Sequence, residues 1–301
     1  MNNLVNFCRS LWQFSRPHTV IGTGLSLTAI WLIVADIYGV YRFVDLAIAL
    51  AACLGGNIYI VGLNQIFDLE IDRINKPHLP LAAADLSLNQ AWAIVISTAI
   101  AAMLLSISQG IFLFLTVSLS LIIGTAYSVP PLRLKRSPWL ASACILAVRG
   151  LVVNLGIFLH FQALARAQTE ILPIIWLLSG FVLVFSYAIA ICKDLPDMEG
   201  DAQFQILTLS LLWGKELVLK ATKRLLLALY LTMAVLLWQL NFPLLALIHG
   251  AIALIFFGLF FWRCDQVDLN SQASITQFYQ FIWKLFFLEY LIFPIACLLQ
   301  A

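Results

Sequence analysis

The chain has 301 residues, of which 62% are hydrophobic and only 11% are charged. Because soluble domains carry about 25% charged residues, this composition predicts a polytopic membrane protein with little sequence left for a separate soluble domain. The formal net charge of +2 is small and the basic residues are scattered over the loops, which argues against a nucleic-acid partner.

Residues 1–17 form an amphipathic lead-in. Apolar side chains alternate there with Arg9 and Arg16, which predicts an interfacial helix that lies on the membrane surface. The segment is too polar for the apolar core of a removable signal peptide, so we expect the first long apolar run to be retained.

Apolar runs recur along the rest of the chain. A membrane-spanning helix needs about 20 largely apolar residues, and nine segments qualify: residues 18–36, 44–66, 91–108, 110–128, 138–160, 171–192, 222–239, 243–262 and 278–299. Residues 206–219 are apolar but contain Lys215, Glu216 and Lys220, which predicts an interfacial helix in a long loop. The predicted fold is an all-α bundle of nine transmembrane helices, forming one domain over residues 1–301, with a cap of short helices and loops on the cytoplasmic side.

The distribution of basic residues predicts the orientation of this bundle. Of the 17 Lys and Arg residues, 13 fall in the N-terminal segment or around the loops that follow the second, fourth, sixth and eighth spans. Since cytoplasmic loops carry the excess of Lys and Arg, the N-terminus is predicted to be cytoplasmic.

The second predicted span runs into the first of two acidic clusters. Asn64, Asp68 and Asp72 recur at four-residue intervals, which places them on one face of a helix. Asn57, seven residues before Asn64, falls on the same side one level deeper. The pattern indicates metal ligands together with an amide that orients a substrate. Taken alone, it fits a solvated helix end equally well.

A basic loop follows the fourth span. It contains Tyr127, Arg133, Lys135 and Arg136, on the same predicted side of the membrane as the first acidic cluster. The donor fork of an arginine suits phosphate oxygens, which makes Arg133 a candidate phosphate contact. We interpret Lys135 and Arg136 instead as ordinary residues of positive-inside topology.

Charged residues inside the spans need a separate explanation. Arg149 lies in the fifth span with Asn154 nearby, and an intramembrane arginine is costly unless it is paired. Two kinds of partner are open: an aspartate of an acidic cluster, or the carboxylate of a substrate. Lys284 and Glu289, in the last span, are expected to pair with each other.

The second acidic cluster follows the sixth span. Asp194, Asp197 and Asp201 follow an i, i+3, i+7 pattern on one helical face, and Gly200 permits a close backbone approach. A bound divalent cation would justify such repelling carboxylates, because Mg²⁺ prefers oxygen ligands. Two such helix ends can flank one pocket and hold one or two Mg²⁺ ions that coordinate a diphosphate. Three nearby cations would complete that diphosphate site: Arg73, Lys76 and Lys193.

These motifs together resemble the UbiA superfamily of intramembrane prenyltransferases. The resemblance rests on the two acidic clusters and on their position after the second and sixth of nine helices. The stretches 64–77, 127–136, 148–156 and 193–201 are similar to the homogentisate branch of that superfamily. The resemblance spans nearly the whole chain.

The resemblance implies Mg²⁺-dependent transfer of a prenyl group, with phytyl diphosphate favoured, to the aromatic ring of homogentisate with loss of CO₂. It implies a lateral opening to membrane lipid and a role in tocopherol biosynthesis in a photosynthetic organism's plasma, thylakoid or plastid membrane. Asn64, Asp68 and Asp72 would bind one ion, and Asp197 and Asp201 another, with Asp194 in support. The four implied catalytic residues are Asp68, Asp72, Asp197 and Asp201. The implied substrate-binding residues are Asn57, Asn64, Arg73, Lys76, Tyr127, Arg133, Arg149, Asn154, Lys193 and Asp194.

One departure from the family pattern affects the donor site. The family usually has basic residues after the second cluster, whereas this chain reads Ala-Gln-Phe-Gln-Ile-Leu at 202–207. Several alternatives also stay open. They are a geranylgeranyl or solanesyl donor, a chlorophyllide or hydroxybenzoate-type acceptor, a cation-coupled transporter and an aspartyl intramembrane protease.

Overall fold

The computed structural model describes residues 2–166, 169–262 and 266–299, which form helices joined by turns. Eight helical segments in these ranges are long and apolar enough to cross a membrane. They are α2 (Pro17–Tyr38), α3 (Phe43–Phe67), α5 (Leu88–Ser108), α6 (Ile111–Ser128), the continuous α7 (Pro138–Leu146), η2 (Ala147–Val152) and α8 (Val153–Arg166), α9 (Pro173–Lys193), α12 (Lys215–Gln239) and α15 (Gln272–Leu298). A ninth, α13 (Pro243–Ile255) with the π-helical η3 (Phe256–Phe260), is shorter. The predicted all-α membrane bundle is confirmed.

Local sequence signals explain where many of these helices begin and end. Proline is the first residue of α2, α7, α9 and α13, where its missing N–H costs no helical hydrogen bond. Ser87 and Gln90 form a capping box at the start of α5. Gly39, with a positive φ of 66°, ends α2.

The prediction of one interfacial helix over residues 206–219 is wrong. Gly214, at φ 76°, separates the short α11 (Leu209–Trp213) from α12, which begins at Lys215 rather than at residue 222. Glu216 and Lys220 are exposed and lie 3.6 Å apart as an i, i+4 pair. Their charges therefore stay at the surface of a membrane-spanning helix that is longer than its apolar stretch.

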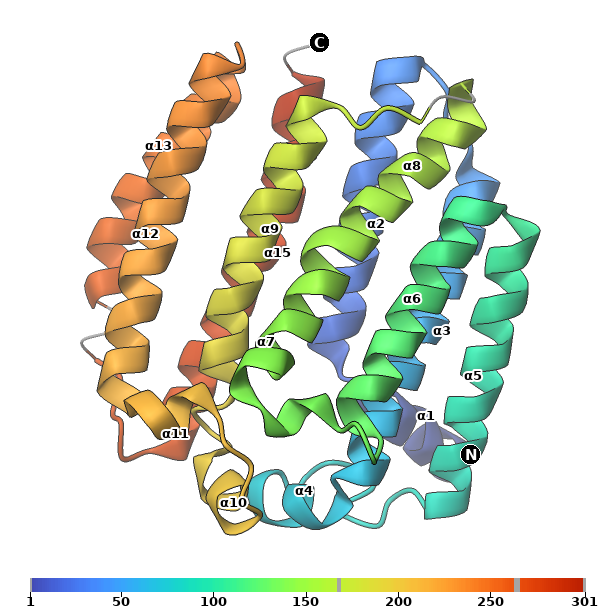
Figure 1. Cartoon of the computed structure of the whole chain (residues 1–301), viewed down its shortest axis with the longest axis vertical. Helices are drawn as coiled ribbons and strands as arrows, with labels where there is room; N and C mark the ends of the chain where they lie inside the picture. The colour runs from blue at the N-terminus through green and yellow to red at the C-terminus, as the bar shows by residue number, and fades with distance from the viewer. Residues whose placement is uncertain (1, 167–168, 263–265, 300–301) are drawn as a thin grey trace.

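The long helices pack side by side (Figure 1). α2 contacts α3, α8 and α15, while α3 contacts α5 and α6, and α12 packs between α9 and α13. The short helices α4 (Leu69–Asn75), α10 (Met198–Gln203), α11 and η1 (Leu134–Arg136) gather at one end of the bundle, near α1 (Asn2–Phe14). We call this end the cap. A cap of short helices is thus present, as predicted.

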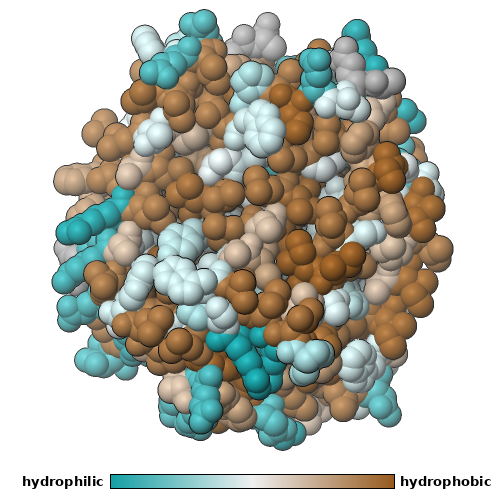
Figure 2. All heavy atoms as spheres, viewed as in Figure 1, coloured by the Kyte–Doolittle hydropathy of each residue, from teal (hydrophilic) through white to brown (hydrophobic). Residues whose placement is uncertain are grey.

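The outer surface of the bundle is apolar. Figure 2 shows hydrophobic residues over most of one face, with hydrophilic residues gathered at the lower end and along the edges. Large apolar side chains are left exposed along the outward faces of the helices, among them Leu104 at 64%, Ile122 at 63% and Leu254 at 75%. Because water would penalise such a surface, the chain is an integral multi-pass membrane protein.

Candidate active site

A cavity of about 1180 Å³ lies inside the bundle beneath the cap. Its walls come from α2, α3, α6, η2, α9 and α15, and the cap closes it with residues of α4 and α10. In the described parts of the chain, α5, α12 and α13 contribute no residue to it. Both acidic clusters line its cap end, so segments more than 100 residues apart in the chain share one chamber.

The first cluster keeps one face across a helix break. α3 ends at Phe67 and α4 begins at Leu69, but the backbone bonds Asp68 N to Asn64 O (3.0 Å) and Asp72 N to Asp68 O (2.7 Å) preserve the helical register. Asn64, Asp68 and Asp72 therefore all line the cavity. Asn64 Nδ2 donates to Asp68 Oδ2 at 2.9 Å, which orients the amide and the carboxylate together.

The second cluster is carried by the end of α9 and by α10. Asp194, Asp197 and Asp201 line the cavity, and backbone bonds link them in series. Gly200 N donates to Asn75 Oδ1 of α4 at 2.8 Å. A Cβ on Gly200 would lie only 2.5 Å from that oxygen. The close approach expected at this glycine thus brings the two acidic clusters together.

Basic side chains from three segments of the chain reach the carboxylates. Lys76 pairs with Asp197 and lies 3.9 Å from Asp72, so it bridges the two clusters. Asp68 pairs with Lys135 and, at 3.0 Å, with Arg133 Nη2.

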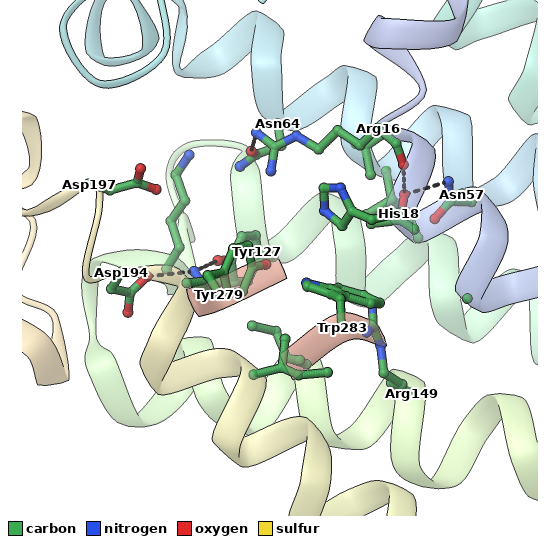
Figure 3. Close-up of a pocket in the computed structure, with 18 of the residues that line it drawn as sticks. Arg16, His18, Asn57, Asn64, Tyr127, Arg149, Asp194, Asp197, Tyr279 and Trp283 are labelled. Carbon is green, nitrogen blue, oxygen red and sulfur yellow. Dashed lines mark hydrogen bonds and ion pairs between the residues drawn. The ribbon is translucent and has the colours of Figure 1, made fainter. Parts of the chain in front are cut away.

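A third basic contact lies at the end of α9. Lys193 Nζ is 2.9 Å from Asp194 Oδ1 and donates to Tyr127 OH at 3.1 Å. Figure 3 labels Asp194 and Tyr127, between which these contacts are drawn as dashed lines.

Burial shifts the pKa values of several charged side chains at this end of the cavity. Burial, and then the charges of Asp197 and Asp194, raise the pKa of Asp201 from 3.8 to about 7. The pKa of Asp72 is also raised, chiefly by burial. Burial lowers the pKa of Lys76, but the Asp197 carboxylate outweighs it and the net shift is upward. Partly buried acids of this kind favour cationic ligands.

Two carboxylate oxygens in this region are left without partners. Asp72 Oδ2 and Asp197 Oδ1 are buried and accept no hydrogen bond. Across the described residues, no three His, Cys, Asp or Glu side chains are grouped tightly enough to hold a metal ion as they stand. Four cluster carboxylates instead pair with lysines, so a bound ion would replace ammonium groups as their partner; they belong to Asp68, Asp72, Asp194 and Asp197.

The deeper part of the cavity is lined by aromatic rings and one arginine. Arg149 projects from η2, with its guanidinium carbon 4.4 Å from the centroid of the Trp283 ring. The His18 ring lies 4.9 Å from the same indole, edge to face. Asn57 Nδ2 donates to Thr19 Oγ1 at 3.0 Å. Figure 3 shows Arg149 and Trp283 across the cavity from Asp194 and Asp197.

Three of the predicted site residues do not line the cavity. Arg73 is exposed on α4 and pairs with Glu70 at 2.7 Å. Arg133 reaches Asp68 from behind the wall. Asn154 is fully buried in α8, where it bonds to the backbone of η2 and to Tyr290.

Sequence reasoning also missed several cavity residues. Lys135 is interpreted above as a topology residue, because the sequence of a basic loop does not indicate which of its residues is buried against a carboxylate. Arg16 and His18 were missed although an Arg-Pro-His sequence opens the first span, which is an unusual place for two polar side chains. Tyr279 and Trp283 in α15 gave no signal beyond ordinary aromatic content.

The expected pair between Lys284 and Glu289 is wrong. Glu289 Oε1 lies 2.6 Å from His249 Nε2 in the buried layer between α13 and α15. Lys284, five residues earlier in the same helix, instead lines the cavity.

Comparisons with known proteins agree on one family. Residues 25–285 match the UbiA prenyltransferase family. The chain is 52% identical over 298 residues to homogentisate phytyltransferase of Synechocystis sp., covering 96% of this chain and 95% of the relative. It is 38% identical over 308 residues to the chloroplastic homogentisate solanesyltransferase of Arabidopsis thaliana, covering 98% of this chain and 78% of the relative. Its fold is similar to that of a UbiA homolog from Archaeoglobus fulgidus bound to GPP and Mg²⁺, with a TM-score of 0.65, 18% identity, and coverage of 96% of this chain and 99% of that one.

Proposed function

The chain belongs to the UbiA prenyltransferase family, and from that premise we propose that it transfers a phytyl group from phytyl diphosphate to homogentisate. The chain is thus an aromatic prenyltransferase, and the family predicted from the motifs is confirmed. The observation that carries the substrate assignment is the 52% identity over nearly the full length of the Synechocystis homogentisate phytyltransferase.

The residues at the cap end fit a divalent cation. The buried oxygens of Asp72 and Asp197 lack partners, and burial together with the negative charges of Asp197 and Asp194 raises the pKa of Asp201. Carboxylate and amide oxygens are the donors that Mg²⁺ prefers. Six residues would hold one or two ions: Asn64, Asp68, Asp72, Asp194, Asp197 and Asp201. When bound, Mg²⁺ would neutralise the diphosphate and the charge that develops as it leaves.

The basic residues of the cavity would hold the diphosphate from the other sides. Lys76, Lys135 and Lys193 already lie against the carboxylates, so a bound metal diphosphate would offer each ammonium group a phosphate oxygen in exchange. Lys193 and Lys135 would in this way take over contacts that the loop 202–207, which lacks basic residues, does not supply. Arg73 has no part in this arrangement, because it is exposed.

The chemistry then divides between the two ends of the cavity. The C1–O bond of the allylic donor breaks, and the diphosphate leaves toward the lysines. The ring carbon of the acceptor bonds to C1 and loses its proton, while CO₂ departs from the side chain and the remaining methylene takes a proton. The rings of Tyr127, Tyr279 and Trp283 line the route and can stabilise positive charge on the donor. The surrounding apolar wall excludes water that would quench it.

Several finer assignments belong to the same proposal. Phytyl is favoured over solanesyl by the higher identity to the phytyl enzyme. The basic cap end faces the cytoplasm under the positive-inside rule, and a cyanobacterial relative favours a photosynthetic membrane. A cation-coupled transporter is less favoured, because the acids lie at the ends of α3 and α9 rather than in helices broken near the midplane.

Product formation by the purified protein tests the proposal. The assay supplies homogentisate, radiolabelled phytyl diphosphate and Mg²⁺, with EDTA in a parallel sample. We expect radiolabelled methylphytylquinol in the sample with free Mg²⁺ and none in the sample with EDTA. Asp68→Asn should abolish it, and the exposed Arg73→Gln should leave it within about twofold of wild type, as is usual for surface changes. Absence of product from the folded protein with homogentisate, but turnover of another acceptor, would reject the assignment.

A further inference from the structure

The cavity contains a second cationic site, remote from the diphosphate lysines. Arg149 lies within the membrane-spanning segment Pro138–Arg166, where an unpaired charge is costly. Among the described residues no carboxylate lies within ion-pair distance of its guanidinium, and its buried Nη1 has no hydrogen-bond partner. Of the two kinds of partner left open by the sequence, a cluster aspartate is therefore ruled out.

Aromatic rings hold the guanidinium of Arg149 in place but accept no hydrogen bond from it. Its carbon lies 4.4 Å from the centroid of Trp283 and 5.5 Å from that of Phe286. Such contacts attract a cation through the ring face, but they accept none of its planar N–H donors. The forked edge of Arg149 is left free for an anion in the cavity.

Arg149 lies on a π-helical turn whose backbone is fixed by hydrogen bonds from buried side chains. η2 is a π-helical turn, a feature that occurs often at functional sites. Asn154 Nδ2 donates to the carbonyls of Arg149 (3.3 Å) and Gly150 (3.2 Å). Tyr290 OH, from α15, donates to Asn154 Oδ1 at 2.9 Å. Both side chains are buried, so this chain of bonds fixes the turn against the helix that also carries Trp283.

The position of this site separates it from the donor's anion. Figure 3 places Arg149 and Trp283 on the opposite side of the cavity from Asp194 and Asp197, with Tyr279 between them. An aromatic ring lying in that interval would have the leaving diphosphate on one side and Arg149 on the other. The second substrate of the reaction is an aromatic acid.

We infer that Arg149 binds the carboxylate of the acceptor, and that Asn154 and Tyr290 are positioning residues for it. The inference rests on the proposed function, since it takes the acceptor to be an aromatic acid. A bidentate arginine contact inside an apolar helical bundle is strong and directional. The cavity would therefore select acceptors that carry an acidic side chain, and neutral quinols would bind without this contact.

Acceptor binding without the donor gives the direct test. Protein in lipid nanodiscs is equilibrated with radiolabelled homogentisate, and unlabelled methylhydroquinone, which has the same ring without the carboxylate, serves as the competing probe. We expect Arg149→Gln to weaken homogentisate binding on the order of 30-fold, the effect of losing a charged hydrogen-bond pair. Binding of methylhydroquinone and the KM for phytyl diphosphate should change less than about twofold, because neither ligand uses this contact.

Three further variants show whether the loss of binding is specific to the carboxylate contact. Arg166→Gln, an exposed position at the end of the same helix, is the matched control and should bind both acceptors like wild type. Tyr290→Phe keeps the ring but frees the π-helical turn, so it should raise the KM for homogentisate while sparing methylhydroquinone. Removal of a buried unpaired charge should not unfold the protein, and Arg149→Lys should recover part of the affinity.

The outcomes separate this inference from the proposed function. Equal losses for both acceptors in Arg149→Gln, or unchanged homogentisate binding, would overturn the role of Arg149. Wild-type protein that binds the neutral quinol as tightly as the acid would overturn it too. If wild type prefers another aromatic acid, the acceptor assignment fails, and the same comparison with that acid and its decarboxylated form still decides the role of Arg149.

Discussion

The contact between Gly200 and Asn75 is the point at which the two acidic clusters are held together, and Gly200→Ala should break it. The new Cβ would lie 2.5 to 2.7 Å from three atoms of the Asn75 amide, so that amide must swing away. The 2.8 Å bond from Gly200 N is then lost. An unsatisfied buried pair of this kind costs about 1–3 kcal/mol, and residual crowding adds to it. We expect a total loss of about 2–3 kcal/mol in unfolding free energy, together with weaker Mg²⁺ binding.

Thermal unfolding in detergent, with and without Mg²⁺, measures both effects. Gly180→Ala is the matched control, because it is also helical but its Cβ would meet no atom within 4 Å. In an Asn75→Ala background the clash is absent, so the added cost of Gly200→Ala should fall to a few tenths of a kcal/mol, and the two changes should couple strongly. Strictly additive costs, or a Gly200→Ala protein with unaltered stability and Mg²⁺ binding, would refute the reasoning.

Four other expectations follow from charged groups described above. Because the pKa of Asp201 is raised to about 7, Mg²⁺ affinity measured by calorimetry should rise about fivefold from pH 6 to 7, about twofold more from pH 7 to 8, and level off above that. The native state keeps a proton that the unfolded chain releases above pH 3.8, so the metal-free melting temperature should fall as pH rises toward 7. Lys135→Met should raise the KM for the donor about tenfold or more, whereas Arg136→Gln, exposed one residue later, should not. His249→Leu should destabilise the protein by about 3–5 kcal/mol by stranding the Glu289 carboxylate, and Glu289→Gln should cost less in the same unfolding assay.

The helices and the acidic clusters could be predicted from local patterns. Apolar length determines the spans, and the four-residue spacing of Asn64, Asp68 and Asp72 survives the break between α3 and α4 because the backbone bonds continue across it. The start of α12 could not be placed, since Lys215 and Glu216 carry charges that a hydropathy window excludes. A glycine at residue 214 was the better guide to that boundary.

The partners of charged residues could not be predicted in the same way. Lys135 and Arg136 are neighbours in the chain with the same charge, yet one is buried against Asp68 and the other is exposed. Glu289 pairs with His249 on another helix rather than with Lys284, five residues earlier in its own helix. Such pairings depend on how each helix is rotated about its axis relative to its neighbours. The spacing of residues within one helix gives no information on that rotation.

The absence of α5, α12 and α13 from the cavity wall has a consequence for how this chain can change over time. Substitutions in these three helices must keep an apolar surface toward the lipid and must preserve packing against neighbours such as α3 and α9. They do not have to preserve contacts with a substrate. Drift should therefore accumulate there without altering selectivity. A shift to a longer or shorter donor has to arise in the helices that enclose the chamber, so ancestral reconstruction of donor preference can leave out α5, α12 and α13.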